Sequence, residues 1–196
     1  MANKRGRPLE RSDRRADILS AALQCFVDRG FYGTAIPEIA KRAGVAAGTI
    51  YRYFDSKEAL VNALFRHWKT EVAQRVFTKF PYDAAPREQF RVMWHEIIDF
   101  ARENPAAFAF IELHNHASYL DDESRTVDGN TKTFARSVIQ GAQADGLLKP
   151  LDAVVLMELV FGAFVGIMRA HWEGRIELTD AVVADAEQAC WDAVSA

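Results

Sequence analysis

The sequence predicts an all-α protein of about nine helices, in which a small N-terminal domain of three helices precedes a larger helical domain. Nearly every segment repeats its apolar residues at the spacing of an amphipathic helix, and no segment shows the alternation that indicates a half-buried strand. Glycine and proline interrupt the helical pattern at intervals, where they favour turns. The chain has 196 residues, which is enough to bury a sizeable core.

The N-terminal part of the chain contains three predicted helices. The first covers about Ser12–Arg29, and Gly30 is suited to the left-handed conformation that often follows a helix. The second begins at Thr34, the expected N-cap, and ends at Gly44. The third extends from about residue 46 to residue 54.

A long helix and a break in the helical pattern divide the rest of the chain. The long helix is expected from Lys57 to about Thr78, with Asp55 or Ser56 as its N-cap. Residues 80–86 then interrupt the periodicity and contain two prolines. We therefore expect an N-terminal domain at residues 1–56, a connecting helix at about 57–78 and a C-terminal domain at 79–196. The helices expected in the C-terminal domain are Arg87–Glu103, Asn104–Ala117, Asp121–Gly146, Asp152–Gly174 and Thr179–Val194.

The charge of the chain is unevenly distributed. The net charge is -3, but residues 1–60 carry 11 Lys and Arg against 7 Asp and Glu, a net of +4. Residues 61–196 therefore carry 13 against 20, a net of -7. This asymmetry predicts that the N-terminal end meets a polyanion and that the acidic body does not.

Cysteine usage and apolar runs bear on where the protein works. Cys25 and Cys190 are far apart and match no metal-binding spacing, so we expect reduced thiols in a cytoplasmic protein. The basic N-terminus lacks the apolar core of a secretory signal. The longest apolar stretch, Ala153–Met168, is shorter than the ~20 residues that span a bilayer, so we expect no transmembrane helix.

The second and third predicted helices are short, and residues 44–46 join them in the tight turn of a helix-turn-helix. Ala47 and Gly48 keep the third helix slim at its N-terminal end, so it can approach base edges in the ~12 Å major groove of DNA. The Thr49 hydroxyl and methyl groups and the Arg52 guanidinium are suited to reading bases there.

Phosphate contacts are expected around the same helix. The hydroxyl groups of Tyr51 and Tyr53 are suited to them. Lys57 and Thr34 lie at predicted helix N-termini, where backbone N–H groups also favour a phosphate.

A short basic arm precedes the first helix. Arg5 and Arg7 in this arm could reach a neighbouring phosphate or the minor groove. The alternative interpretation is a packed helical hairpin with exposed polar residues, preceded by a solvated basic tail.

Three segments of the N-terminal domain carry a family resemblance: FVDRGFYGT, IPEIAKRAGV and, above all, AGTIYRYFDSKEAL. Through them, about a quarter of the chain, from about Arg15 to Leu64, resembles the DNA-binding domain of the TetR/AcrR family of transcriptional regulators. The resemblance implies a homodimeric repressor that binds a palindromic operator in double-stranded DNA and whose C-terminal domain takes a small-molecule inducer. Ala47 and Arg52 stand where family members vary, so they would set the operator sequence. The residues whose types match the family's DNA contacts are Thr34, Thr49, Tyr51, Tyr53 and Lys57.

The C-terminal domain is expected to dimerise, because a single helix-turn-helix offers few contacts and a dimer reads two half-sites. The helix over residues 152–173 is apolar on more than one face, and its two glycines would let backbones approach closely. Simple burial of this helix in the core is the alternative. The expected interface residues are Phe161, Gly162, Val165, Gly166 and Trp191.

Aromatic residues and methionines of the middle helices are interspersed with a few polar side chains, a composition typical of small-molecule pockets. We expect a hydrophobic or aromatic inducer there, although many of these aromatic residues could be plain core. The candidate ligand-binding residues are Trp94, Phe108, Glu112, His116, Phe134, Phe164, Met168 and Trp172.

The segment Glu112–His116 contains two histidines, but on a helix they lie ~200° apart and cannot share a metal from one face. We therefore expect no metal and no cofactor. The sequence contains no Gly-rich phosphate loop and no G-x-S-x-G motif, so we do not expect an enzyme. Two alternatives stay open, namely a DNA-binding regulator without a small-molecule ligand and a metal-binding helical protein.

Overall fold

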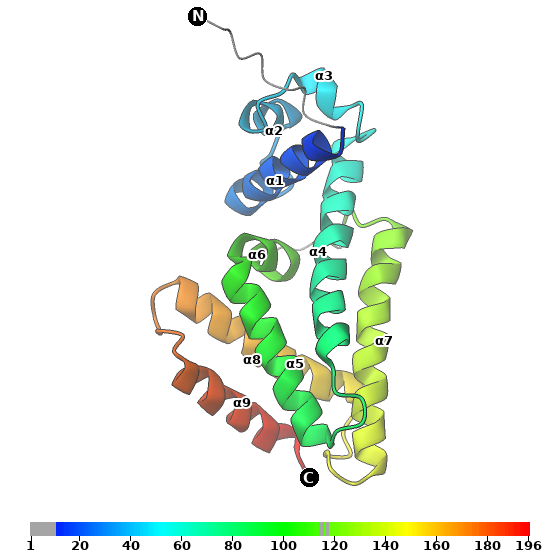
Figure 1. The fold of residues 1–196 in the computed structure, drawn as a ribbon, viewed down its shortest axis with the longest axis vertical. Coiled ribbons are helices and arrows are strands. Elements are labelled where there is room, and N and C mark those ends of the chain that lie inside the picture. Colours follow the sequence, from blue (N-terminus) through cyan, green and yellow to red (C-terminus); the bar gives the residue numbers. More distant parts are fainter. Residues whose placement is uncertain (1–10, 114–115, 117) are drawn as a thin grey trace, which may run out of the picture.

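The structure of the chain, a computed structural model, describes residues 11–113, 116 and 118–196. Within these residues it contains nine α-helices and no β-strand, which confirms the predicted all-α fold (Figure 1). The helices are α1 (Arg11–Arg29), α2 (Ile36–Arg42), α3 (Ala47–Ile50), α4 (Lys57–Lys79), α5 (Pro86–Glu103), α6 (Pro105–Leu113), α7 (Asp122–Ala144), α8 (Ala153–Trp172) and α9 (Asp180–Val194).

Helices α1, α2 and α3 form the head of the molecule, at the end that carries the N-terminus (Figure 1). Its core consists of apolar side chains from all three helices, since Ile18, Phe26, Ile39 and Ile50 are at most 1% exposed. Gly44 lies in the turn between α2 and α3 with φ 66°, a left-handed conformation that glycine adopts without steric cost. The head therefore folds as the predicted helix-turn-helix.

Two local predictions in the head are wrong. The N-cap of α2 is Ala35 rather than Thr34, and the Glu38 carboxylate accepts a hydrogen bond from the Ala35 N–H at 3.1 Å. Helix α3 ends at Ile50, and residues 51–53 continue as a turn rather than as helix to Phe54. In that turn, the N–H of Arg52 donates to the carbonyl of Thr49 at 3.1 Å. This bond joins residues three apart, as in a 3₁₀ turn, whereas the bonds of an α-helix join residues four apart.

Helix α4 connects the head to the rest of the molecule, where it packs against α5 and α7 (Figure 1). Its N-cap is Ser56, one of the two residues that the sequence predicts for this position, and the Ser56 hydroxyl accepts the N–H of Ala59 at 3.0 Å. Asn62, 2% exposed, fixes α4 to the segment before α7: its amide donates to the carbonyl of Tyr119 at 2.8 Å and accepts the N–H of Asp121 at 2.9 Å.

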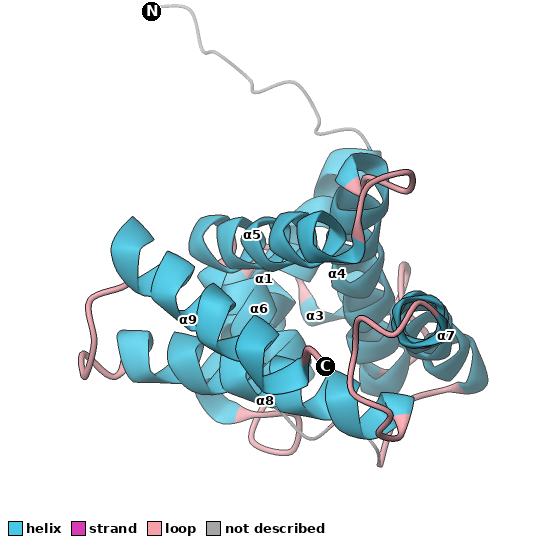
Figure 2. Ribbon diagram, turned by 90° about the horizontal axis from the view of Figure 1, so that it is seen from below, coloured by secondary structure: helices cyan, strands magenta, loops and turns pink. Residues whose placement is uncertain are grey.

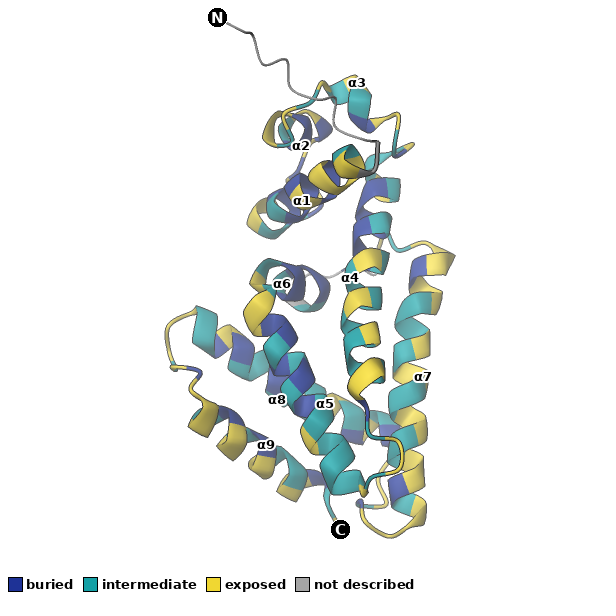
Figure 3. Cartoon of the chain, viewed as in Figure 1, coloured by how far each residue is buried: buried dark blue, intermediate teal, exposed yellow. Residues whose placement is uncertain are grey.

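Helices α4, α5, α7, α8 and α9 form the body. Seen along the long axis, α4, α5, α7, α8 and α9 are arranged around its interior (Figure 2). Helix α6 lies between the head and the body and contacts α1, α4 and α5. It ends at Leu113, earlier than the predicted Ala117, and residues 114, 115 and 117 lie outside the described part of the chain. The first turns of α4 and parts of α1, α5 and α6 are buried, whereas the outer faces of α7 and α9 are largely exposed (Figure 3).

Helix α8 extends beyond the apolar stretch Ala153–Met168, on which the expectation of no transmembrane helix is based. It has 20 residues with a mean hydropathy of 1.9, so by length and composition alone it could cross a membrane, and 22% of that stretch is buried. The low burial shows that much of its apolar surface is uncovered in a single chain.

Candidate functional site

The N-terminal end of α3 presents a slim, exposed surface. Gly48 is exposed, and a Cβ placed on it would meet nothing within 4 Å. Ala47 and Thr49 beside it are half-buried, whereas Ile50 points inward and is fully buried. The sequence predicts this division between an outward and an inward face.

The turn after α3 extends the same surface. Tyr51 is 54% exposed and Arg52 is exposed, while Tyr53 is half-buried and packs against the core of the head. Phe54 is buried, and the Arg15 guanidinium lies 5.2 Å from the centre of its ring. The guanidinium of Arg15 on α1 therefore lies beside the turn that carries Tyr51 and Tyr53.

Two of the predicted phosphate contacts lie differently from the expectation. Thr34 is 2% exposed, and its hydroxyl donates to the carbonyls of Cys25 at 3.0 Å and Gly30 at 2.8 Å, so it faces the core and not a partner. Lys57 is half-buried, and its ammonium donates to the carbonyls of Phe31 at 2.9 Å and Thr34 at 3.0 Å. Arg5 and Arg7 lie outside the described residues.

The Lys57 ammonium also lies 4.2 Å from the centre of the Phe31 ring. A lysine ammonium has three donors, of which two are used by these carbonyls. Lys57 therefore holds the loop before α2 in place and retains one N–H for an outside partner. This structural role has no signal in the sequence, because it depends on a contact between residues 26 positions apart.

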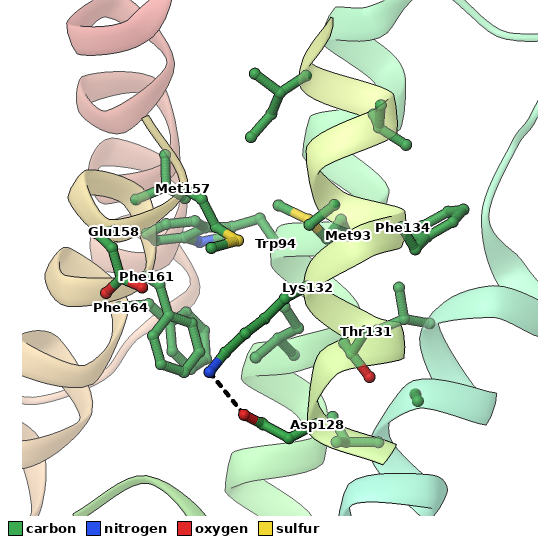
Figure 4. A pocket seen from close by; sticks show the side chains of 18 of the residues that line it. Met93, Trp94, Asp128, Thr131, Lys132, Phe134, Met157, Glu158, Phe161 and Phe164 are labelled. Atoms are coloured by element: carbon green, nitrogen blue, oxygen red, sulfur yellow. Dashed lines mark hydrogen bonds and ion pairs between the residues drawn. The ribbon is translucent and has the colours of Figure 1, made fainter. Parts of the chain in front are cut away.

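A cavity of about 690 Å³ lies in the body, lined by α4, α5, α6, α7, α8 and the end of α9 (Figure 4). Most of its wall is apolar and aromatic. The predicted ligand residues that line it are Trp94, Phe108, Glu112, His116, Phe134 and Phe164. The other two do not: Met168 is fully buried in the core, and Trp172 packs on the Phe108 ring with centroids 5.6 Å apart.

Four ionisable side chains form what we call the charged end of the cavity: Lys69, Glu112, Asp128 and Lys132. The Lys69 ammonium lies 2.9 Å from Glu112 Oε1 and 3.2 Å from Asp128 Oδ1. Lys132 donates to Asp128 Oδ2 at 2.6 Å (Figure 4). Only Glu112 among the four is predicted from the sequence, because lysine and aspartate on an amphipathic helix are normally solvated.

Burial acts on these groups in opposite ways. It raises the pKa of Glu112, and the Lys69 ammonium offsets this only in part. Burial by itself would lower the pKa of Lys69, but attraction by Glu112 and Asp128 outweighs it and raises that pKa. Burial also disfavours the charged form of Asp128, yet Lys132 and Lys69 together hold the pKa of this carboxyl below its usual value.

His116 is buried and lines the cavity. Its Nε2 is 2.6 Å from the carbonyl oxygen of Phe110, which can only accept, so Nε2 carries a proton. Its Nδ1 is 2.8 Å from the Tyr119 hydroxyl. No group of three or more potential metal-ligating side chains occurs in the part of the chain that the structure describes.

The outer face of α8 carries a row of apolar and small residues. Val155 and Leu159 are 49% and 53% exposed, and Gly162 and Gly166 follow on the same face at helical spacing. Of the other predicted interface residues, Val165 is half-buried, while Phe161 and Trp191 line the cavity. The structure therefore divides the predicted interface between two surfaces.

Both parts of the chain match known families. Residues 18–64 match the bacterial regulatory proteins of the tetR family, and residues 65–196 match the tetracyclin repressor-like C-terminal domain. A TetR family transcription regulator from Marinobacter aquaeolei VT8 has the same fold, with a TM-score of 0.85 and 27% identity over 95% of this chain and 98% of that one.

Three regulators are similar in sequence. The HTH-type transcriptional regulator RutR of Escherichia coli K12 is 30% identical over 157 residues, which cover 78% of this chain and 72% of RutR. The fatty acid metabolism regulator protein of Bacillus subtilis is 25% identical over 148 residues, or 74% of this chain and 76% of that protein. The transcriptional activator FasR of Mycolicibacterium smegmatis is 31% identical over 109 residues, which cover 56% of this chain and half of FasR.

The exposed helix-turn-helix, the helical body and the matches to both halves of the chain agree with one another. The chain therefore belongs to the TetR family and is a transcriptional regulator with a DNA-binding helix-turn-helix.

Proposed function

We propose that the protein is a homodimeric repressor, which a small hydrophobic inducer releases from a palindromic operator. The observation that carries this proposal is that one helix, α4, links the exposed α3 surface to a cavity of about 690 Å³ in the same chain. Lys57 at the start of α4 contacts the head, and Lys69, about three turns later, belongs to the charged end of the cavity, where it pairs with Glu112.

Base reading is assigned to the exposed end of α3. Ala47 and Gly48 allow close approach to base edges, and Thr49 and Arg52 supply the hydrogen bonds. Tyr51 and Tyr53 would contact phosphates, and Lys57 would offer its remaining N–H to one. Thr34 is left out of this set because its hydroxyl is buried. The arm residues Arg5 and Arg7 remain predicted phosphate or minor-groove contacts.

Dimerisation is assigned to the outer face of α8. A monomer that exposes Val155, Leu159 and Gly162 in one row leaves apolar surface in water that a second copy could cover. A two-fold pair of chains would then present two α3 helices to successive half-sites, ~34 Å or a multiple apart. Phe161 and Trp191 are proposed as cavity residues instead of interface residues.

The inducer is proposed to bind in the cavity. Its aromatic wall and its few charged groups have the composition of a small-molecule site. The Bacillus subtilis relative is named as a regulator of fatty acid metabolism, which agrees with an apolar ligand. Ligand binding could change operator affinity only by its preference between two conformations of the body, with a typical coupling of ~1–3 kcal/mol.

Selection of bound duplexes from a random pool tests the DNA part of the proposal. We expect enrichment of a palindrome, with affinity that falls steeply as salt rises. Recovery of an asymmetric site, or of no preferred site, would contradict a symmetric dimer. A reporter placed behind the selected operator then distinguishes repression from activation, since one relative is named as an activator.

A further inference from the structure

We propose that the ligand of the cavity is a lipophilic amine, whose protonated nitrogen pairs with Glu112 while its apolar body lies along the aromatic wall. This inference rests on the proposed small-molecule function of the cavity and names the chemical class that the cavity accepts. It follows from the contacts of Glu112, from the burial of the charged groups and from the residues around them.

Among the four residues of the charged end, Glu112 has a carboxylate oxygen that is available to accept a hydrogen bond from a ligand. Its Oε1 accepts one hydrogen bond, from Lys69 at 2.9 Å. Its Oε2 has no hydrogen-bond partner among the described residues, although Glu112 lines the cavity and its side chain is only 11% exposed. An ionised carboxylate can accept about four hydrogen bonds, so Glu112 can take a further donor from a ligand.

The buried part of the charged end has an excess of negative charge. The side chains of Lys69, Glu112 and Asp128 are 13%, 11% and 23% exposed, whereas that of Lys132 is 58% exposed. Water screens Lys132 much more than the other three, which leaves one buried ammonium facing two carboxylates. The raised pKa of Glu112, caused first by burial, agrees with a carboxylate that lacks sufficient positive charge nearby.

The other charged residues of the wall do not reverse this balance. Arg125 and Glu158 also line the cavity, but both are exposed and their charges are opposite. A ligand carboxylate would lie beside Glu112 and Asp128, whose negative charges would repel it. Both lysines already have carboxylate partners within 3.2 Å, so neither is available to offset that repulsion. A ligand ammonium would instead satisfy the carboxylate that has only one partner.

The aromatic wall also suits a cation with an apolar body. The Lys69 ammonium already lies 5.7 Å from the centre of the Phe65 ring, which shows that a cation is accommodated against this wall. Phe108 and Phe164 contact each other in the wall, with centroids 5.4 Å apart. Figure 4 shows Phe161 and Phe164 on α8 at the same cavity as the Lys132–Asp128 pair on α7.

The test compares three probes that share one apolar body: phenylbutylamine, phenylbutanol and phenylbutyrate, titrated calorimetrically into the full-length protein at pH 7. We expect the amine to bind at least about tenfold more tightly than the acid, with the alcohol between them. In Glu112→Gln, the amine should lose its advantage over the alcohol, while the alcohol binds as before. Glu158→Gln, a carboxylate of the same wall that is exposed, is the matched control and should keep the preference for the amine.

The outcomes separate this inference from the function on which it rests. If the acid or the alcohol binds best and releases operator DNA, the ligand class is wrong and the ligand-responsive function stands. If no probe binds or releases DNA, both are contradicted. The comparison of the three probes on the unmodified protein needs no variant, so it remains decisive even if Glu112→Gln fails to fold.

Discussion

The ring of Tyr119 stacks on the ring of Phe31, with ring centroids 4.2 Å apart and planes inclined by 27°. Phe31 belongs to the head and Tyr119 to the segment that leads into α7. The Tyr119 hydroxyl contacts His116, which lines the cavity, and the Lys57 ammonium lies over the Phe31 ring. A continuous chain of contacts therefore runs from the cavity wall to the DNA-binding head.

This stack should contribute a measurable interaction energy between head and body. Phe31→Leu and Tyr119→Leu each remove one ring, and we expect a coupling of ~0.5–1.5 kcal/mol between them in a double-mutant cycle. Urea unfolding of the four proteins measures it. Effects that add within ~0.3 kcal/mol would show that the stack does not connect the two parts energetically.

A substitution at Gly48 tests the proposed DNA contact of α3 without disturbing the fold of that helix. A Cβ at this position would meet nothing within 4 Å, so Gly48→Phe should leave the melting temperature nearly unchanged. The added ring would nevertheless occupy the space next to the base edges in a groove only ~12 Å wide. We expect operator affinity to fall by more than about tenfold, or ~1.4 kcal/mol, in a fluorescence-anisotropy titration.

Gly141→Phe provides the matched control for this change. Gly141 is an exposed glycine of α7, and a Cβ there would also meet nothing within 4 Å. This variant should bind the operator as well as the unmodified protein does. If both variants bind normally, the N-terminal end of α3 does not enter the groove.

The sequence contains enough information to predict the head because local chemistry determines most of it. Gly44 marks a turn that needs positive φ, and Ile50 follows the inward periodicity of α3. Thr34 shows the limit of such reasoning. Threonine is a common N-cap, but the Thr34 hydroxyl instead donates to the carbonyls of Cys25 and Gly30 at the end of α1. These partners are available only because α1 packs beside residue 34, which the local sequence does not reveal.

The cavity is harder to predict, because helical periodicity does not distinguish a large apolar residue that packs in or on the core from one that lines a void. Met168 is buried in the core and Trp172 packs against it, whereas Phe161 lines the void. The charged end depends on pairs such as Lys69 with Glu112, which are 43 residues apart. Tertiary packing alone turns these two residues from solvated charges into buried partners.

Arg52 and Tyr51 should differ in what they contribute to DNA binding. Arg52 is exposed at the proposed base-reading surface, so Arg52→Ala should cost ~1–3 kcal/mol and relax the preference at one base position. Tyr51→Phe removes a hydroxyl assigned to a phosphate, so it should weaken binding to all sequences alike. Binding measured against a panel of single-base operator variants separates the two effects. An unchanged preference profile in Arg52→Ala would remove that residue from the proposed readout.

Glu96 should make the stability of the fold depend on pH. Its carboxylate accepts hydrogen bonds from Arg75 Nε at 2.9 Å and from Lys79 at 2.8 Å, which join α4 to α5. Burial by itself would raise the pKa of Glu96, but these two cations outweigh it and hold that pKa below the usual value. A lowered pKa in the folded state means that the stabilisation is complete above the unfolded pKa of about 4.3 and disappears as the pH falls through the folded value.

Glu96→Gln tests this linkage. At pH 7 the variant should be less stable than the unmodified protein by about 1–3 kcal/mol, because Arg75 and Lys79 lose a charged acceptor. As the pH falls below about 4.3, the unfolded chain takes up the Glu96 proton before the folded protein does. The difference in stability between the two proteins should therefore shrink, until the pH reaches the lower folded pKa. Urea unfolding at several pH values measures the difference, and Glu158→Gln, which removes an exposed carboxylate, controls for the change in net charge. A difference that stays constant from pH 7 to pH 3 would mean that Glu96 stabilises the fold through its shape and not through its charge.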